Sequence, residues 1–268
     1  MTPFPGRPAA SARADGRRGV RVGAAATCLL VSVACTGGIP EAPRAFTGGF
    51  TTVEAKNVPW FVTVAVRHSG QWNVCSGALT TPRTVATAAH CVLEGAEYWV
   101  YRGALLADDH VKASSAQVLA PKAGGDVAML TLPTALPNSH FLEVSDAPPV
   151  VGGQYYLFGV GTVPGQATEA PKNRTIHRLL VGVGQIDTTN RIAAVVAAKR
   201  HMGCVGDSGG PMVDKELTTL YGVISTGYPK GAGVSCPAIP PTDALTKIGI
   251  VQPHFAVLSG TPTSAATG

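Results

Sequence analysis

The regular spacing of short extended segments is the feature of this 268-residue sequence that most constrains its fold. Apolar and β-branched runs such as Trp60–Arg67 and Asn73–Thr80 recur about every 8–12 residues, with turns between them. Gly (32) and Pro (21) are abundant, and charged residues make up only 14%. This pattern predicts an all-β fold of antiparallel barrels, with Gln252–Leu258 as a short C-terminal helix. Further strands are predicted at Arg83–Ala88, Tyr98–Tyr101, Ala116–Leu119, Asp126–Leu132, Gln154–Gly161, His177–Val183, Arg191–Ala198 and Leu220–Ser225.

The charge of the chain is concentrated near its N-terminus. Residues 1–44 hold six arginines and two acidic residues, which leaves 15 basic and 14 acidic residues in the rest of the chain. The body is therefore almost neutral, and the overall charge of +5 predicts no nucleic-acid partner.

The N-terminal region reads as an export signal. Basic residues up to Arg21 precede Val22–Cys35, an uncharged and mostly apolar run of 14 residues. Because a membrane-spanning helix needs roughly 20 apolar residues, this run predicts a signal peptide over residues 1–35 and no stable membrane span. Residues 36–45 are predicted to form a Pro-rich linker or pro-segment. The alternative to full secretion is a lipid anchor on Cys35.

A serine between glycines, Ser208, is the strongest chemical signal in the chain. It lies in Cys204–Pro211, whose glycines allow a tight turn with exposed backbone N–H groups. A serine becomes a nucleophile when an imidazole takes its proton and N–H groups face the oxyanion that forms. The simpler alternative is a Gly-rich turn with a solvated Asp207. That alternative is disfavoured because His90 and Asp126 occur in comparable local contexts.

Three stretches together resemble the chymotrypsin/trypsin-like serine protease family. They are Thr87–Cys91, Asp126–Leu132 and Cys204–Pro211, which occur in the order His, Asp, Ser. The resemblance implies a protease domain over residues 46–268, with two antiparallel six-stranded β-barrels, a boundary near 135–153 and the active site between the barrels. It implies a secreted serine endopeptidase that acts through an acyl-enzyme intermediate.

In this family each of the matching residues has a role. Ser208 is expected to attack the peptide carbonyl, His90 to carry the proton, and Asp126 to fix and stabilise the imidazole. The N–H groups of Gly206 and Ser208 are expected to form the oxyanion hole. A carboxylate at the start of a buried strand needs a partner, which favours Asp126 over the other acidic residues.

The cysteine count agrees with export. Two of the six cysteines lie in the N-terminal region and four in the body, an even number that suits a secreted disulfide framework. The sequence alone allows three pairings of the four. The family resemblance selects Cys75–Cys91 and Cys204–Cys236.

The resemblance also implies maturation by cleavage. Phe46-Thr47-Gly48-Gly49 resembles the family's mature N-terminus, whose freed α-amine pairs with the acid beside the serine, here Asp207. The larger Phe46 replaces an aliphatic residue, and Thr47 remains the alternative terminus.

Five residues are expected to bind substrate: Met202, Ser225, Thr226, Gly227 and Asp243. Ser225–Gly227 is expected to line the cleft as an extended segment. In the resembling family, an acid six residues before the serine selects basic side chains; here that position is Met202, so an apolar preference is favoured. Asp243 takes a position where that family usually has glycine, which leaves a basic preference open as the alternative.

Two rival functions remain: an esterase-like hydrolase with the same triad, and a catalytically silent binding protein with the protease fold. No cofactor is expected. Asp108-Asp109-His110 is interpreted as a solvated turn, and no metal site is expected. Partners are expected to be a protein or peptide substrate and protein inhibitors, with the protein itself a monomer.

Overall fold

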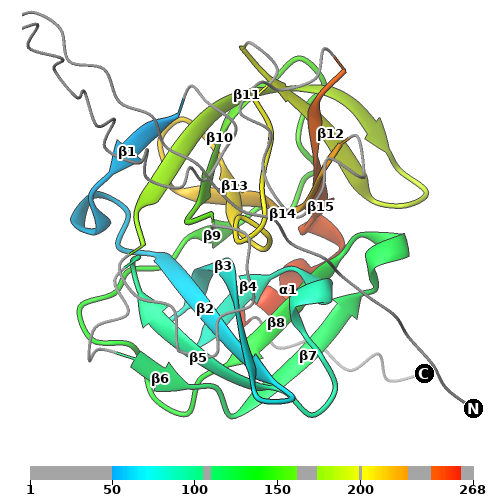
Figure 1. Ribbon diagram of the computed structural model, residues 1–268. Helices are drawn as coiled ribbons and strands as arrows, with labels where there is room; N and C mark the ends of the chain where they lie inside the picture. The colour runs from blue at the N-terminus through cyan, green and yellow to red at the C-terminus, as the bar shows by residue number, and fades with distance from the viewer. Residues whose placement is uncertain (1–49, 105–109, 162–173, 199–200, 229–242, 261–268) are drawn as a thin grey trace, which may run out of the picture. The chain divides into compact units, whose positions relative to one another are not determined.

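Two β-sheets dominate the computed structural model, which describes residues 50–104, 110–161, 174–198, 201–228 and 243–260. All of these residues belong to one compact unit, Ala42–Gly268. The all-β prediction, with two barrel-like sheets and a short C-terminal helix, is confirmed (Figure 1).

The first sheet is built entirely from antiparallel pairs. In the strand β2 (Phe61–His68), the alternate residues Val62, Val64 and Val66 point into the sheet's own core because side chains of a strand alternate between two faces. In spatial order the strands are β6 (His110–Lys112), β5 (Glu97–Arg102), β2 (Phe61–His68), β3 (Gln71–Thr81), β4 (Thr84–Thr87), β8 (Val127–Thr131) and β7 (Ser115–Ala120).

This sheet departs from the predicted closed barrel of six strands. Within the described residues its two edges, β6 and β7, are not paired with each other. They are successive segments of chain, because Ala113 N–H donates to Tyr98 O (2.9 Å) whereas Ser114 N–H donates to Thr131 O (2.8 Å). The backbone thus passes from β5 to β8 at this point, and the sheet is a half-barrel of seven strands.

The second sheet contains the closed barrel. The pairing of β11 with β12 closes a ring of six antiparallel strands, to which β1 adds on one side and β9 adds in parallel to β14. The strands are β1 (Thr51–Val53), β11 (Ile176–Asp187), β10 (Gln154–Gly159), β13 (Pro211–Val213), β14 (Thr219–Tyr228), β15 (Leu245–Ile250), β12 (Ile192–Ala197) and β9 (Glu143–Val144).

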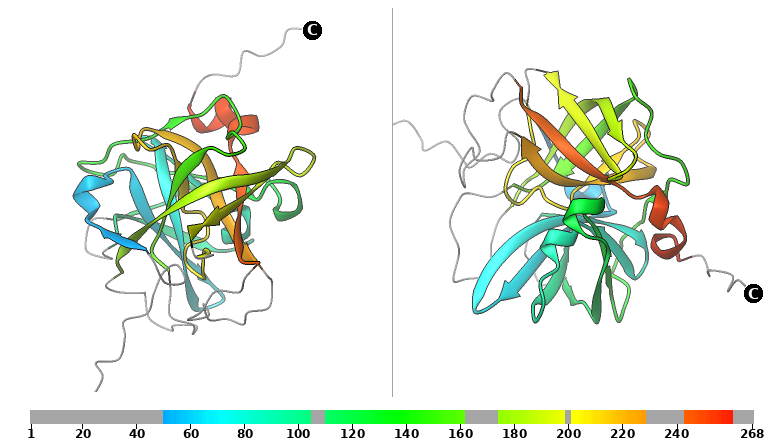
Figure 2. Two further views of the ribbon diagram at one scale, coloured as in Figure 1. Left: turned by 90° about the horizontal axis from the view of Figure 1, so that it is seen from above. Right: turned by 90° about the vertical axis from the view of Figure 1, so that its right-hand side faces the viewer.

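Both ends of the described chain cross over to the other sheet. β1 precedes the first sheet in sequence but pairs with β11 of the second. The C-terminal segment, η5 (Gln252–His254) and α1 (Phe255–Leu258), follows β15 but packs on the first sheet, where Thr80 donates a hydrogen bond to Leu258 O (2.6 Å). Figure 2 shows α1 in red beside the strands of the first sheet.

A shared apolar layer joins the two sheets. Trp60 and Phe61 of the first sheet belong to the same buried cluster as Phe158 and Val223 of the second. The rings of Trp60 and Phe158 meet edge to face, with centroids 5.1 Å apart. This layer holds in place the chain segments that extend from each sheet toward the other. The residues of the candidate site lie on those segments.

Candidate active site

His90 is presented by a short turn that follows β4. The 3₁₀ turn η2 (Ala89–Cys91) begins where the extended Ala88 ends, and Ala89 N–H donates to the backbone oxygen of Asp126 (3.2 Å). The His90 side chain remains 26% exposed, so that it is open to a substrate on one side.

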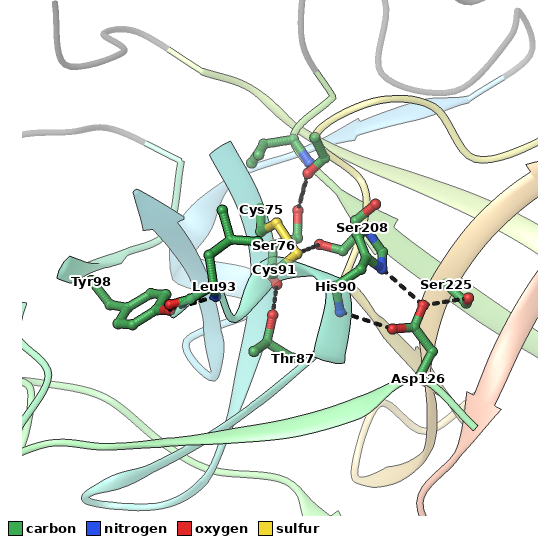
Figure 3. The surroundings of a disulfide bond; sticks show 12 residues. Cys75, Ser76, Thr87, His90, Cys91, Leu93, Tyr98, Asp126, Ser208 and Ser225 are labelled. Atoms are coloured by element: carbon green, nitrogen blue, oxygen red, sulfur yellow. Dashed lines mark hydrogen bonds and ion pairs between the residues drawn. A yellow bond between two sulfur atoms is a disulfide. The ribbon is translucent and has the colours of Figure 1, made fainter. Parts of the chain in front are cut away.

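Asp126 holds both the backbone and the ring of His90. His90 N–H donates to Asp126 Oδ1 (2.9 Å), and His90 Nδ1 lies 2.8 Å from Asp126 Oδ2. Since a carboxylate only accepts hydrogen bonds, Nδ1 carries a proton, and whenever the ring is neutral Nε2 is left as an acceptor. In Figure 3 a dashed line joins the His90 ring to the Asp126 carboxylate, and Ser208 is labelled in the same view.

The Asp126 carboxylate is fully buried and held ionised. Ser225, in β14, donates to Asp126 Oδ2 (2.5 Å). Burial acts to raise the pKa of Asp126, but the hydrogen bonds from His90 and Ser225, together with the charge of His90, bring the pKa below its usual value. Ser225, which was predicted to line the cleft, thus contacts Asp126 of the predicted triad.

Ser208 lies in a turn whose backbone is tightly enclosed. Gly209 has φ +80°, and a Cβ on it would lie 2.2 Å from Thr87 Oγ1. Gly206 has φ +90°, again a conformation that favours glycine. Among the described residues, neither Gly206 N–H nor Ser208 N–H donates a hydrogen bond.

Asp207 points away from solvent and is fully buried. Its Oδ1 accepts from Gly161 N–H and its Oδ2 from Cys204 N–H, both at 2.9 Å. Burial raises the pKa of Asp207 to about 7, against the opposing effect of these two hydrogen bonds. No described cation pairs with this carboxyl.

The predicted disulfide Cys75–Cys91 is confirmed. It joins β3 to the turn that carries His90, which anchors the histidine to the sheet (Figure 3). Cys204 is also disulfide-bonded. Its predicted partner, Cys236, lies outside the described residues.

The predicted substrate-binding residues fall on two segments. Met202 is buried, and a Cβ on Gly227 would lie 2.4 Å from both its Cε and Gly203 O, so these atoms pack closely against Gly227. Ser225 and Thr226 line a depression of ≈ 350 Å³ that extends to η3 (Lys122–Gly124) and the β11–β12 hairpin. Asp243 is exposed, and the predicted pocket wall before it lies outside the described residues.

Several residues at the site were not predicted. Ser76 and Thr87 support the Ser208 turn, while Asp187, Asn190 and Lys247 line the depression. Gly161, whose N–H binds Asp207, was predicted only as the end of the strand Gln154–Gly161, with no role assigned to it. In the described part of the chain, no group of three metal-ligating side chains is found and no helix is long and apolar enough to cross a membrane. Asp108 and Asp109 lie outside it.

Comparison with known proteins agrees with this fold. The family model described as Trypsin matches residues 47–241. Hypodermin-B of Hypoderma lineatum is 27% identical over 239 residues, which cover 77% of this chain and 91% of that protein. Trypsin alpha-4 of Lucilia cuprina is 26% identical (76% and 86% covered), and Kallikrein-2 of Homo sapiens is 25% identical (74% and 85% covered).

Solved structures with the same fold include two distant relatives. Mouse neuropsin, a serine protease, aligns with a TM-score of 0.59 at 19% identity, covering 79% of this chain and 98% of neuropsin. An inactivated protease paralogue of the scabies mite aligns with a TM-score of 0.59 at 20% identity, covering 78% and 95%. The fold is that of the trypsin-like serine proteases. The chain belongs to the trypsin family.

Proposed function

We propose that this protein is a secreted serine endopeptidase whose triad is His90, Asp126 and Ser208. The observation that carries the proposal is the ring of His90, bonded through Nδ1 to a buried, ionised Asp126 (Figure 3), while the next residue, Cys91, contacts the Ser208 backbone with Sγ 3.9 Å from Ser208 O. A carboxylate with no catalytic role is rarely buried at an accessible histidine, because burial of an unpaired charge is unfavourable.

In the proposed reaction, Ser208 Oγ attacks the peptide carbonyl carbon and its proton passes to His90 Nε2. The resulting imidazolium is stabilised by Asp126, and the oxyanion accepts hydrogen bonds from Gly206 and Ser208 N–H. His90 then gives the proton to the leaving amine as the C–N bond breaks. Water, deprotonated by His90, hydrolyses the acyl ester on Ser208, which releases the acid and restores the serine.

The proposed maturation supplies a cation for Asp207. Cleavage before Phe46 or Thr47 frees an α-amine, and the two backbone N–H groups at the carboxyl leave its charge uncompensated. The proposal includes a signal peptide over residues 1–35, with a lipid anchor on Cys35 as the alternative. N-terminal sequencing and mass measurement of the secreted protein test both points.

The proposed primary pocket takes small or medium apolar side chains. The close packing of Met202 Cε and Gly203 O against Gly227 supports this, because long side chains would need these groups to separate. The exposed Asp243 is the residue that favours the alternative, a pocket for basic side chains.

The test compares matched tetrapeptide anilide and ester substrates with the mature protein. We expect hydrolysis of the anilide, and a loss of about 10⁴–10⁶-fold in kcat in the Ser208→Ala variant. Ser114→Ala, which removes an exposed hydroxyl bonded to Thr131 O, is the control and should retain activity. Cleavage of the ester alone would indicate an esterase. If neither substrate is cleaved, the result would indicate a binding protein like an inactivated paralogue.

A further inference from the structure

Ser76, in the middle of β3, joins the Ser208 turn to a second loop through one hydroxyl group. Its side chain is fully buried. The hydroxyl donates to Gly206 O (2.8 Å) and accepts from Val160 N–H (3.2 Å). Both the donor and the acceptor capacity of this hydroxyl are therefore used on backbone groups outside the first sheet.

The backbone of Ser76 is bonded to the same region. Ser76 N–H donates to Ser208 O (2.7 Å), and Ser76 O accepts from Thr87 Oγ1 (2.9 Å). Val160, the donor to the hydroxyl, directly precedes Gly161, whose N–H binds the Asp207 carboxyl. A single residue of the first sheet thus bonds the backbone on both sides of Asp207 and the loop that supports its side chain.

The conformation of Gly206 explains why such a bond matters. A glycine at φ +90° has no side chain to restrict rotation of its two flanking peptides. The peptide between Asp207 and Ser208 is held because Gly210 N–H donates to Asp207 O (2.9 Å), and the N–H of the peptide between Gly206 and Asp207 donates to Cys204 O (3.0 Å). The carbonyl of the peptide between Gly206 and Asp207 accepts a hydrogen bond from the Ser76 hydroxyl, which is the donor that the described residues provide for it.

We propose that Ser76 is a positioning residue for the oxyanion hole, which orients the N–H groups of Gly206 and Ser208 by holding the peptide between Gly206 and Asp207. The inference rests on the proposed protease function. In this proposal a residue of the first sheet bonds directly to the oxyanion-binding turn. The Asp207 carboxyl fixes the same turn from the side of the second sheet.

The alternative is that Ser76 is a buried serine whose hydrogen bonds only compensate for the burial of its hydroxyl. Thr63 is a matched control for this alternative. Thr63 faces Ser76 across the β2–β3 pair, is equally buried, and donates its hydroxyl to a backbone oxygen, Gly103 O (2.6 Å). Its described hydrogen bond does not reach the Ser208 turn. Thr63→Val and Ser76→Ala thus each remove one buried hydroxyl group from neighbouring positions, with one described hydrogen bond at Thr63 and two at Ser76.

The first measurement is kinetic, on mature protein with the best tetrapeptide anilide. Ser76→Ala should lower kcat by about 10–100-fold with KM within about threefold, since an oxyanion donor acts mainly in the transition state. Ser76→Thr, which keeps the hydroxyl, should recover most of this loss, and Thr63→Val should stay within about twofold of the parent. A Ser76→Ala variant as active as the parent, or an equal loss in Thr63→Val, would overturn the inference.

The second measurement does not depend on activity. Hydrogen exchange by mass spectrometry is followed for peptides covering residues 203–210, with every variant made in the Ser208→Ala background. These amides should exchange about tenfold faster in Ser76→Ala than in Thr63→Val. Equal exchange would overturn the role of Ser76 even in an active enzyme. An inactive parent in which the exchange difference persists would instead overturn the protease function alone.

Discussion

Two buried titratable groups, Asp207 and His177, should oppose each other in the pH dependence of stability. Asp207 has its pKa raised from 3.8 to about 7 by burial. His177, whose ring packs edge-on against Phe50 with centroids 4.1 Å apart, has its pKa lowered from 6.5 to about 4 by burial, and its Nδ1 has no partner among the described residues. Each group is thus neutral in the folded state where it would be charged in the unfolded chain.

The signs follow from the number of protons bound. Between pH 4 and 7 the folded protein keeps the proton on Asp207 that the unfolded chain has lost, so this contribution to stability is complete at low pH and disappears as pH rises toward about 7. For His177 the unfolded chain binds the extra proton, so its contribution is complete above pH 6.5 and is lost as pH falls toward about 4. The magnitudes are about 4 kcal/mol for Asp207 and about 3 kcal/mol for His177, at ~1.4 kcal/mol per pKa unit.

The assay is urea unfolding of the uncleaved chain between pH 4 and 7, in the Ser208→Ala background to prevent self-cleavage. In the parent the two contributions nearly cancel up to pH 6.5. Asp207→Asn should leave a rise of about 3 kcal/mol in the free energy of unfolding from pH 4 to 6.5. His177→Phe should leave a fall of about 4 kcal/mol from pH 4 to 7.

Any constant loss of stability in these variants is irrelevant, because the slope against pH is what is compared. Asn at position 207, for example, brings an amide donor against Cys204 N–H and loses one hydrogen bond at every pH. Variants with the same slope as the parent would refute the buried, neutral state of these two groups.

Three further outcomes are expected. Asp126→Asn should lower kcat by about 10⁴-fold, measured on the best anilide, because an amide donor at Nδ1 forces the wrong tautomer on the histidine. Removal of the Cys75–Cys91 disulfide by paired alanine substitution should lower the free energy of unfolding in urea by about 3 kcal/mol. Among tetrapeptides ending in Ala, Val, Phe, Lys or Arg, the apolar residues should be preferred because Met202 narrows the pocket. A preference for Lys or Arg above about tenfold in kcat/KM, abolished by Asp243→Gly, would contradict this.

The proposed triad rests on local signals, because its residues have informative neighbourhoods in the sequence. Ser208 lies among glycines that its enclosed turn requires, and His90 adjoins a disulfide cysteine. The long strands β2 and β3 were also predicted to within a few residues, since their apolar side chains alternate toward a buried core. These signals are local, and they are complete within about ten residues of sequence.

The features that were missed depend on contacts distant in sequence. The strand β13 has three residues and begins at a proline, and β1 is polar, so neither carries a pattern of its own. The strand β15 was not among the predicted strands, although it pairs with both β12 and β14. Ser76 looks like any small residue of a strand, and its contact with Gly206, 130 residues away, exists only in the folded chain.

The two predicted barrels are confirmed as two barrel-like sheets, but the sequence could not indicate where the first one opens, for a related reason. In a closed six-stranded ring, one continuous strand would lie between β5 and β8. Here that strand is interrupted at Ala113–Ser114, where the backbone changes its hydrogen-bonding partner from β5 to β8. The small and polar residues at this point gave no signal for where the interruption would fall.

The most direct test of the triad is covalent labelling of the mature protein with a fluorophosphonate, followed by intact-mass measurement and peptide mapping. Ser208 Oγ displaces fluoride from phosphorus only when a base removes its proton. The account predicts one phosphonyl group per chain, on Ser208, with labelling abolished in His90→Ala. A folded, mature protein that remains unlabelled, or that carries the group on another residue, would contradict the assignment of His90, Asp126 and Ser208.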